Sequence, residues 1–184
     1  MVIVSSRQVH SHLDSPLLVE SFNLLQEDIE VQSYLRMANI MAVKRLGYND
    51  HGPVHAKIIA GSALEIFKLL TSRVEPSSVV HGVCGYDDAQ LIVLLGAFLH
   101  DVGNAVHRID HEQSSAFLSM GILDRILNRV YHDDHELAYR VKCEVLHALF
   151  SSNDSIPCLS VEAGAVTIAD GTDMAEGRSR VPYL

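Results

Sequence analysis

Hydrophobic residues recur along most of the chain at steps of three and four positions, which is the period of an α-helix. The pattern covers residues 16–46, 54–70, 87–101, 111–131, 134–150 and 161–175. Polar residues between positions 28 and 33 divide the first stretch, which predicts two helices there. No stretch alternates between apolar and polar residues over a strand's length. The sequence therefore predicts an all-α fold, a compact bundle of six to eight helices.

The segments between these stretches carry signals for helix ends and loops. Asp110 followed by Gln113 resembles a capping box and predicts a helix beginning near residue 111. Residues 71–87, with their proline, serines and glycines, form the longest predicted loop. Residues 1–15 are polar and irregular, so we expect a flexible N-terminal arm there and a single helical domain over residues 16–184.

Composition excludes two broad classes of protein. With 48% hydrophobic and 20% charged residues, the chain is not intrinsically disordered. Its longest strongly apolar run, residues 91–99, is far shorter than the roughly 20 residues that span a bilayer. Residues 1–14 also lack the basic start and apolar stretch of an export signal. These features predict a cytoplasmic protein without a membrane partner.

The formal net charge is −9, from 14 basic and 23 acidic residues. Binding to a nucleic acid backbone requires clustered Lys and Arg, so this balance argues against nucleic acid as a partner. The three cysteines form no CxxC pair and are expected to be reduced thiols, with Cys143 in the core. Apolar positions on the first helices leave a homo-oligomer open.

Histidine is the unusual component, because eleven are present against five phenylalanines. His100 and Asp101 end the most apolar stretch of the chain, and Asp170 follows a second apolar run. A buried ionised aspartate needs a charged partner, a hydrogen bond or a metal. His55 lies in the first turns of the stretch 54–70, and His111 lies at a helical position between these residues. His147 lies at another such position.

A mixture of histidine nitrogens and carboxylate oxygens suits manganese, iron, cobalt, nickel or zinc in an open, water-bearing site. Magnesium is also compatible, and the sequence permits one or two ions. The alternative for His100, Asp101 and Asp170 is a buried salt bridge between helices. For His55, His111 and His147 the alternatives are ordinary core or surface histidines.

The order His55, His100-Asp101, Asp170 resembles the H…HD…D signature of the HD-domain metal-dependent phosphohydrolases. The stretch LLGAFLHDVGN is similar to the apolar helix of that family that ends in HD-x-G, and VTIADGTDM is similar to its late Ala-Asp ligand. The resemblance covers about residues 47–178. It implies that His55, His100, Asp101 and Asp170 bind a first metal ion, and that Asp101 bridges to a second ion where two are bound.

The segment HGPVHA is similar to the first-ligand segment of cyclic nucleotide phosphodiesterases, which implies that His51 protonates the leaving group. In the dinuclear members further histidines follow the HD pair, and His111 and His147 fall in about the right order for that role. The chain departs from the HD-GYP branch, because Ala148 replaces a second adjacent histidine and the GYP motif is missing. Asn104 also stands where the family commonly has lysine.

Together these features predict a phosphomonoesterase or phosphodiesterase that uses metal-activated water. We expect its substrate to be a nucleotide or a similar small phosphorylated metabolite, with His51 and Asp101 as catalytic residues. Two other functions stay open at this point: a di-iron oxygenase of the HD fold, and a metal- or nucleotide-binding regulatory module with little turnover. Further candidates for contact with the substrate or the ligands are His107, Arg108, Arg178, Arg180 and Asp173.

Overall fold

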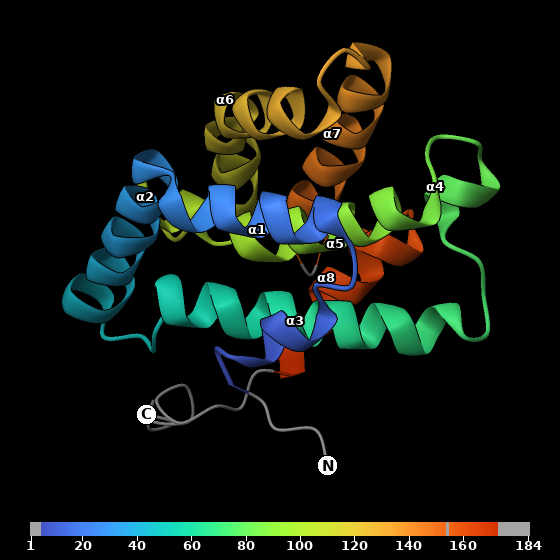
Figure 1. Cartoon of the computed structure of the whole chain (residues 1–184). Helices are drawn as coiled ribbons and strands as arrows, with labels where there is room; N and C mark the ends of the chain where they lie inside the picture. Colours follow the sequence, from blue (N-terminus) through green and yellow to red (C-terminus); the bar gives the residue numbers. More distant parts are fainter. Residues whose placement is uncertain (1–4, 154, 173–184) are drawn as a thin grey trace.

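The computed structural model describes residues 5–153 and 155–172 of the chain, and this part is entirely helical in its regular structure (Figure 1). The prediction of an all-α bundle is confirmed. The α-helices are α1 (Pro16–Glu27), α2 (Ile29–Asn39), α3 (Pro53–Thr71), α4 (Ser77–Val80), α5 (Tyr86–Leu99), α6 (His111–Tyr131), α7 (His135–Phe150) and α8 (Val161–Thr172). Three short elements accompany them: the 3-10 helices η1 (Gln8–His12) and η3 (Val102–Ala105) and the π-helix η2 (Ile40–Arg45).

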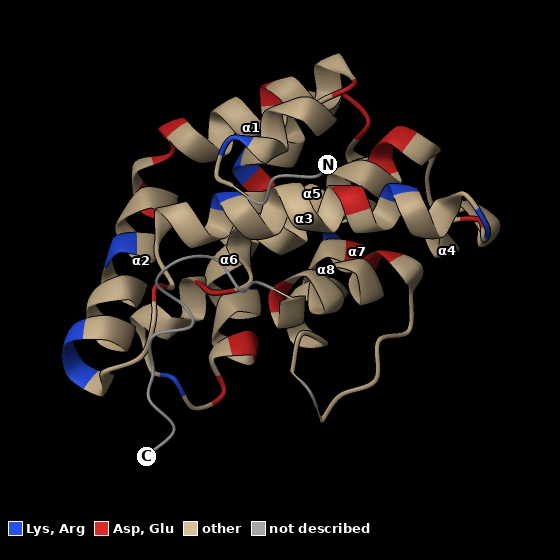
Figure 2. Ribbon diagram, turned by 90° about the horizontal axis from the view of Figure 1, so that it is seen from below, with Lys and Arg blue, Asp and Glu red and all other residues tan. Residues whose placement is uncertain are grey.

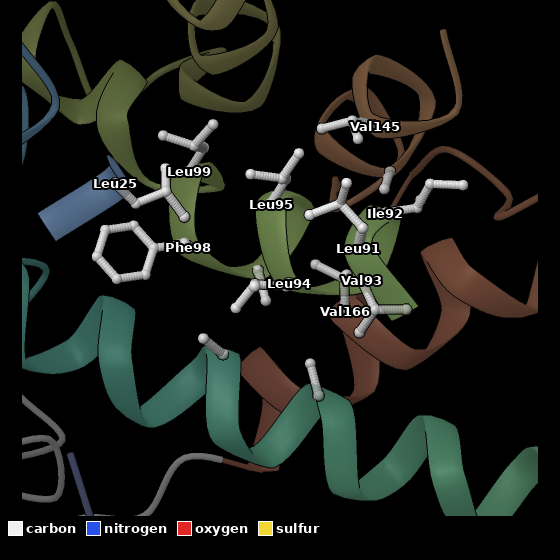
Figure 3. Close-up of a cluster of buried hydrophobic side chains, with 14 of the residues drawn as sticks. Leu25, Leu91, Ile92, Val93, Leu94, Leu95, Phe98, Leu99, Val145 and Val166 are labelled. Carbon is white, nitrogen blue, oxygen red and sulfur yellow. The ribbon is translucent and has the colours of Figure 1, made fainter. Parts of the chain in front are cut away.

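Helix α5 forms the centre of the core. Every residue from Ala89 to Leu99 is buried, because α1, α3, α7 and α8 pack around this helix (Figure 3). Phe98 meets Phe22 of α1 edge to face, with ring centroids 5.9 Å apart. A helix that is apolar on every side is stable only in such surroundings. His100 and Asp101, which follow the C-terminal end of α5, therefore lie in the interior of the molecule.

The N-terminal segment packs more closely than its sequence indicates. Residues 8–12, part of the predicted flexible arm, form η1, which lies against α3 (Figure 1). Val9 is fully buried, and a Cβ added at Gly61 of α3 would lie 2.8 Å from the Val9 backbone nitrogen. The side chain of His12 is 3.3 Å from Glu65. Thus the small residue at position 61 allows η1 to contact α3.

Helix boundaries agree with the predicted stretches to within a few residues. The structure differs from the sequence predictions at three other points. The predicted long loop contains α4, a single turn of helix. Helix α6 begins at His111 as expected, but Asp110 has a left-handed backbone (φ 54°) and its side chain forms no capping hydrogen bond. Cys143, expected in the core, is exposed on α7.

Charged residues are interspersed over the outer faces of the helices (Figure 2). One exposed group joins α6 to the start of α2, because Arg125 donates hydrogen bonds to Asp28 and Glu30. Within the described residues, none of the helices combines the length and the apolar character needed to cross a membrane.

Candidate metal centre

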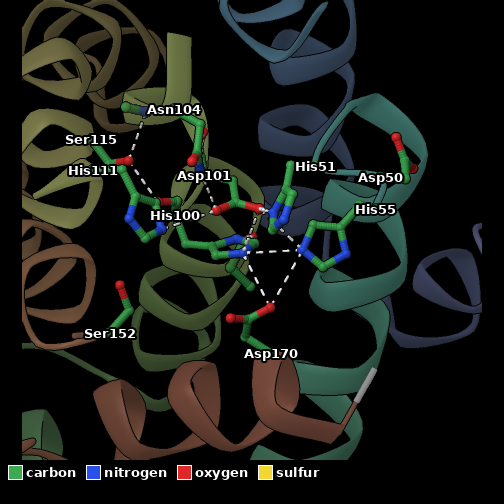
Figure 4. Close-up of polar contacts among 12 residues, drawn as sticks. Asp50, His51, His55, His100, Asp101, Asn104, His111, Ser115, Ser152 and Asp170 are labelled. Carbon is green, nitrogen blue, oxygen red and sulfur yellow. Dashed lines mark hydrogen bonds and ion pairs between the residues drawn. The ribbon is translucent and has the colours of Figure 1, made fainter. Parts of the chain in front are cut away.

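The four residues predicted to bind a first metal ion lie together where α3, α5 and α8 meet (Figure 4). His55 belongs to the first turn of α3, His100 and Asp101 follow the last turn of α5, and Asp170 lies in the last turn of α8. The first three are about 1% exposed. The side chain of Asp170 is 36% exposed, so the cluster is open to solvent on the side of this residue.

The side-chain atoms of these residues converge on one another. Nε2 of His55 is 3.2 Å from Nε2 of His100, 3.2 Å from Oδ2 of Asp101 and 3.4 Å from Oδ1 of Asp170. Nε2 of His100 is 3.3 Å from Oδ2 of Asp101 and 3.6 Å from Oδ1 of Asp170. Neighbouring ligands that bind one ion at about 2.0–2.2 Å lie roughly 3 to 3.5 Å apart. The donor set and its spacing therefore fit a divalent transition-metal ion.

A hydrogen bond fixes the tautomer of His100. Its Nδ1 lies 2.8 Å from the carbonyl oxygen of Ala97, and a carbonyl can only accept. The ring therefore donates from Nδ1 and presents Nε2 to the cluster. Metal-binding histidines are commonly oriented in this way by a carbonyl or carboxylate behind the ring.

Electrostatics also favour a cation at this position. Burial alone disfavours a charged His100, but the carboxylates of Asp101 and Asp170 outweigh burial and raise its pKa to about 10. Burial likewise opposes ionisation of Asp101 and Asp170, yet the neighbouring histidines hold the pKa of each carboxyl well below its usual range. Without a metal ion, a proton on His100 supplies the positive charge that two carboxylates require. A metal ion must therefore displace that proton.

The two oxygens of Asp101 face different groups. Oδ2 lies among His55, His100 and His51, whereas Oδ1 accepts a hydrogen bond of 2.8 Å from Nδ2 of Asn104. Oδ1 also lies 3.4 Å from Nε2 of His111. Asn104 thus orients the carboxylate of Asp101. Residue 104 is the position at which the HD-domain family commonly has a lysine.

The turn that carries His100 and Asp101 is held by α6. The hydroxyl of Ser115 donates to the carbonyl of His100 over 2.6 Å and accepts from the N–H of Gly103 over 2.8 Å. A Cβ at Gly103 would collide with the carbonyl oxygen of His111 and the backbone nitrogen of Ser115. The glycine of HD-x-G therefore allows α6 to approach the turn. Sequence reasoning missed Ser115, whose only signal is a polar residue on the buried face of α6.

His51 joins the cluster from the loop before α3. Its Nδ1 lies 2.7 Å from Oδ2 of Asp101, and the residue is 4% exposed. The backbone N–H of His51 donates to Oδ1 of Asn39 at the end of α2. Gly52 lets this loop pass close to Asn39, because a Cβ there would lie 3.0 Å from that side chain. Asn39 has no motif that could have marked its role.

The remaining candidates separate into three groups. His111 is 8% exposed and lies beside Oδ1 of Asp101, as described above. His107 is an exposed residue whose Nδ1 accepts from the N–H of Ile109. Asp173, Arg178 and Arg180 lie outside the described residues.

The structure does not bring His147 to the cluster. Its Nε2 accepts a hydrogen bond of 3.0 Å from the N–H of Leu159, and the residue lines a groove between α6 and α7 with Phe117 and Phe150. Two groups of described residues have ligand atoms that all lie within 4.8 Å of one another. One is His51, His55 and Asp101, the other is His55, His100 and Asp170, and neither includes His147. The interpretation of His147 as a ligand of this centre is corrected accordingly. His147 lies near the C-terminal end of α7, on a face that borders this groove.

Comparison with curated proteins identifies a relative of this chain. The chain is 47% identical over 162 residues to the uncharacterized protein MJ1020 of Methanocaldococcus jannaschii. The aligned region covers 88% of this chain and 62% of that protein, so the chain spans less than two thirds of its relative. No protein-family model matches the chain. No solved structure matches it either.

Proposed function

We propose that the protein is a metal-dependent phosphohydrolase acting on a nucleotide or a similar small phosphorylated metabolite. The observation that carries this proposal is the convergence of the His55 and His100 imidazoles, whose Nε2 atoms lie 3.2 Å apart and each lie 3.2–3.6 Å from one oxygen of Asp101 and one of Asp170. The order of these residues along the chain supports it, since it resembles the H…HD…D signature.

His55, His100, Asp101 and Asp170 would hold the ion. A divalent transition metal bound there acidifies a water molecule and neutralises charge on phosphoryl oxygens. Nδ1 of His51 donates a hydrogen bond to Asp101. His51 would act as the general acid and transfer a proton from Nε2 to the departing oxygen. The exposed edge at Asp170 admits the substrate, because the other members of the cluster are buried.

The surroundings of the cluster favour a hydrolase over a di-iron oxygenase. A second iron requires its own set of ligands, and His147 lies elsewhere in the fold. Of the predicted second-metal ligands, His111 alone lies near Asp101, and its Nε2 faces Arg108.

The proposal is tested by metal analysis together with a panel of phosphate mono- and diesters, including nucleotides, in the presence of Mn²⁺. We expect hydrolysis by the wild type and a loss of at least about a thousandfold in His100→Ala and Asp101→Ala, since each removes a ligand. His135→Ala, an exposed histidine on α7, is the matched control and should retain activity. Metal binding without hydrolysis of any ester would instead support a regulatory module. Oxygen consumption with Fe²⁺ would support the oxygenase.

A further inference from the structure

Arg108 lies in the loop between η3 and α6, beside the half of the site that contains Oδ1 of Asp101. Its Nη1 is 3.0 Å from Nε2 of His111, 3.3 Å from Oδ1 of Asn104 and 4.0 Å from Oδ1 of Asp101. An imidazole nitrogen, an amide oxygen and a carboxylate oxygen are all atoms that bind metal ions. The positive guanidinium therefore lies among three potential metal ligands.

The tautomer of His111 shows that Arg108 is the donor in this contact. Nδ1 of His111 lies 3.1 Å from the carbonyl of Arg108 and 3.2 Å from the carboxylate of Glu112, both of which are acceptors. Nδ1 therefore carries the hydrogen, and the lone pair on Nε2 accepts from Arg108. A metal ion beside His111 would need the same lone pair.

We propose that Arg108 is the second cation of the site. Its guanidinium occupies the position that a second metal ion would take, so the centre holds a single metal ion, and Arg108 binds the phosphoryl oxygens of the substrate. This inference rests on the proposed phosphohydrolase function and deepens it.

The remaining donors of Arg108 are available for an anion. Among the residues that the structure describes, its Nε and Nη2 form no hydrogen bond, and its side chain is 36% exposed. The ring of Tyr48 lies 6.0 Å from the guanidinium carbon and supports the group from one side. A planar guanidinium presents its N–H groups in the geometry that phosphate oxygens accept.

Asp101 places the two positive groups next to each other. Oδ2 faces the ligand cluster, whereas Oδ1 faces Asn104 and His111 (Figure 4). Oδ1 is also the Asp101 oxygen that lies 4.0 Å from Nη1 of Arg108. In two-metal phosphatases, ions about 3.5–4 Å apart hold a phosphoryl group between them. A metal ion held by the ligand cluster would form an equivalent pair of charges with Arg108. Asn104 is neutral and stands where the HD-domain family commonly has a lysine. Arg108 supplies a positive charge near that position.

The first test is metal stoichiometry, which does not depend on turnover. Metal-free protein is titrated with Mn²⁺ by calorimetry, and the bound ion is examined by electron paramagnetic resonance. We expect one Mn²⁺ per chain and a mononuclear spectrum. Two ions per chain in the wild type would overturn this inference and leave the proposed function intact. Failure to bind any ion would overturn both.

The second test is the affinity of the Mn²⁺-loaded protein for inorganic phosphate. Arg108→Ala should weaken binding by about tenfold or more, and Arg108→Lys should recover part of it as a point charge. Arg140→Ala removes an exposed arginine from α7 and should leave phosphate affinity unchanged. Circular dichroism confirms that each variant is folded. Unchanged phosphate affinity in Arg108→Ala would overturn the role of Arg108, whereas absence of hydrolysis by the wild type would count against the function itself.

Discussion

Ser115 connects two backbone segments that the metal centre depends on. Its hydroxyl bonds the carbonyl of His100 and the N–H of Gly103, and the residue is fully buried. Ser115→Ala leaves a donor and an acceptor buried without partners, which costs about 1–3 kcal/mol each. We therefore expect the free energy of unfolding to fall by about 2 kcal/mol or more and Mn²⁺ affinity to fall with it. Denaturant unfolding and calorimetric titration measure the two effects.

Ser119, one turn further along α6, is the matched control. It is also fully buried, but its hydroxyl has no hydrogen-bond partner among the described residues. Ser119→Ala removes an unsatisfied polar group, so stability should stay unchanged or rise. Equal destabilisation by the two substitutions would show that the hydrogen bonds of Ser115 do not support the turn.

The start of α2 matters to the site because the other end of this helix carries Asn39, which accepts from the backbone of His51. Oδ1 of Asp28 caps α2 by accepting from the N–H groups of Glu30 and Val31, at 2.8 and 3.1 Å. Oδ2 accepts from Arg125 of α6 at 2.9 Å. A single carboxylate thus combines a helix cap with a link between two helices.

Three variants separate these contributions. Asp28→Ala removes the cap and the ion pair, and we expect a loss of about 1–2 kcal/mol. Asp28→Asn keeps a good capping side chain and should cost about 1 kcal/mol or less, as should Arg125→Ala, because the arginine is half exposed. Thermal or urea denaturation measures the series. A loss in Asp28→Asn as large as that in Asp28→Ala would mean that charge rather than capping stabilises this junction.

Most helices could be predicted from the sequence because hydrophobic residues spaced three and four positions apart form the buried face of a helix. The stretch containing residues 91–99 is apolar on all sides, and the structure places it at the centre of the core. The left-handed Asp110 and the contact of Val9 with Gly61 could not be predicted, since both depend on how separate elements pack.

The site was predictable to the extent that its residues carry a recognisable order. His55 and His100 each lie close to Asp101 and Asp170, as expected, and His51 lies beside Asp101. Spacing along the chain does not show which way a helix faces, so His147 was assigned to the wrong place. Asn39 and Ser115 contact the site only through tertiary packing, and no motif marks either of them.

At the scale of the whole molecule, the cluster links stability to pH. His100 has a raised pKa, so the stability from its protonation is complete below its ordinary value of 6.5 and is lost as pH rises toward about 10. Asp101 and Asp170 have lowered pKa values, so their contribution is present above 3.8 and is lost as pH falls below it. With respect to these groups, the metal-free protein is most stable between these two ordinary values.

Metal binding should stabilise the folded protein more strongly as pH rises, opposite to the effect of His100 protonation in the metal-free protein. A metal ion on His100 must displace the proton from Nε2, so its affinity rises as pH increases, and a ligand that binds only the folded state stabilises it by mass action. We expect Mn²⁺ at one fixed concentration to raise the melting temperature little at about pH 5 and by several degrees at about pH 8, relative to protein in chelator. His100→Gln removes a ligand together with the titrating group, so its metal-induced shift should be small at both pH values, whereas His135→Ala should keep the wild-type dependence. A metal-induced shift that stays constant across this range would show that no proton leaves the cluster when the ion binds.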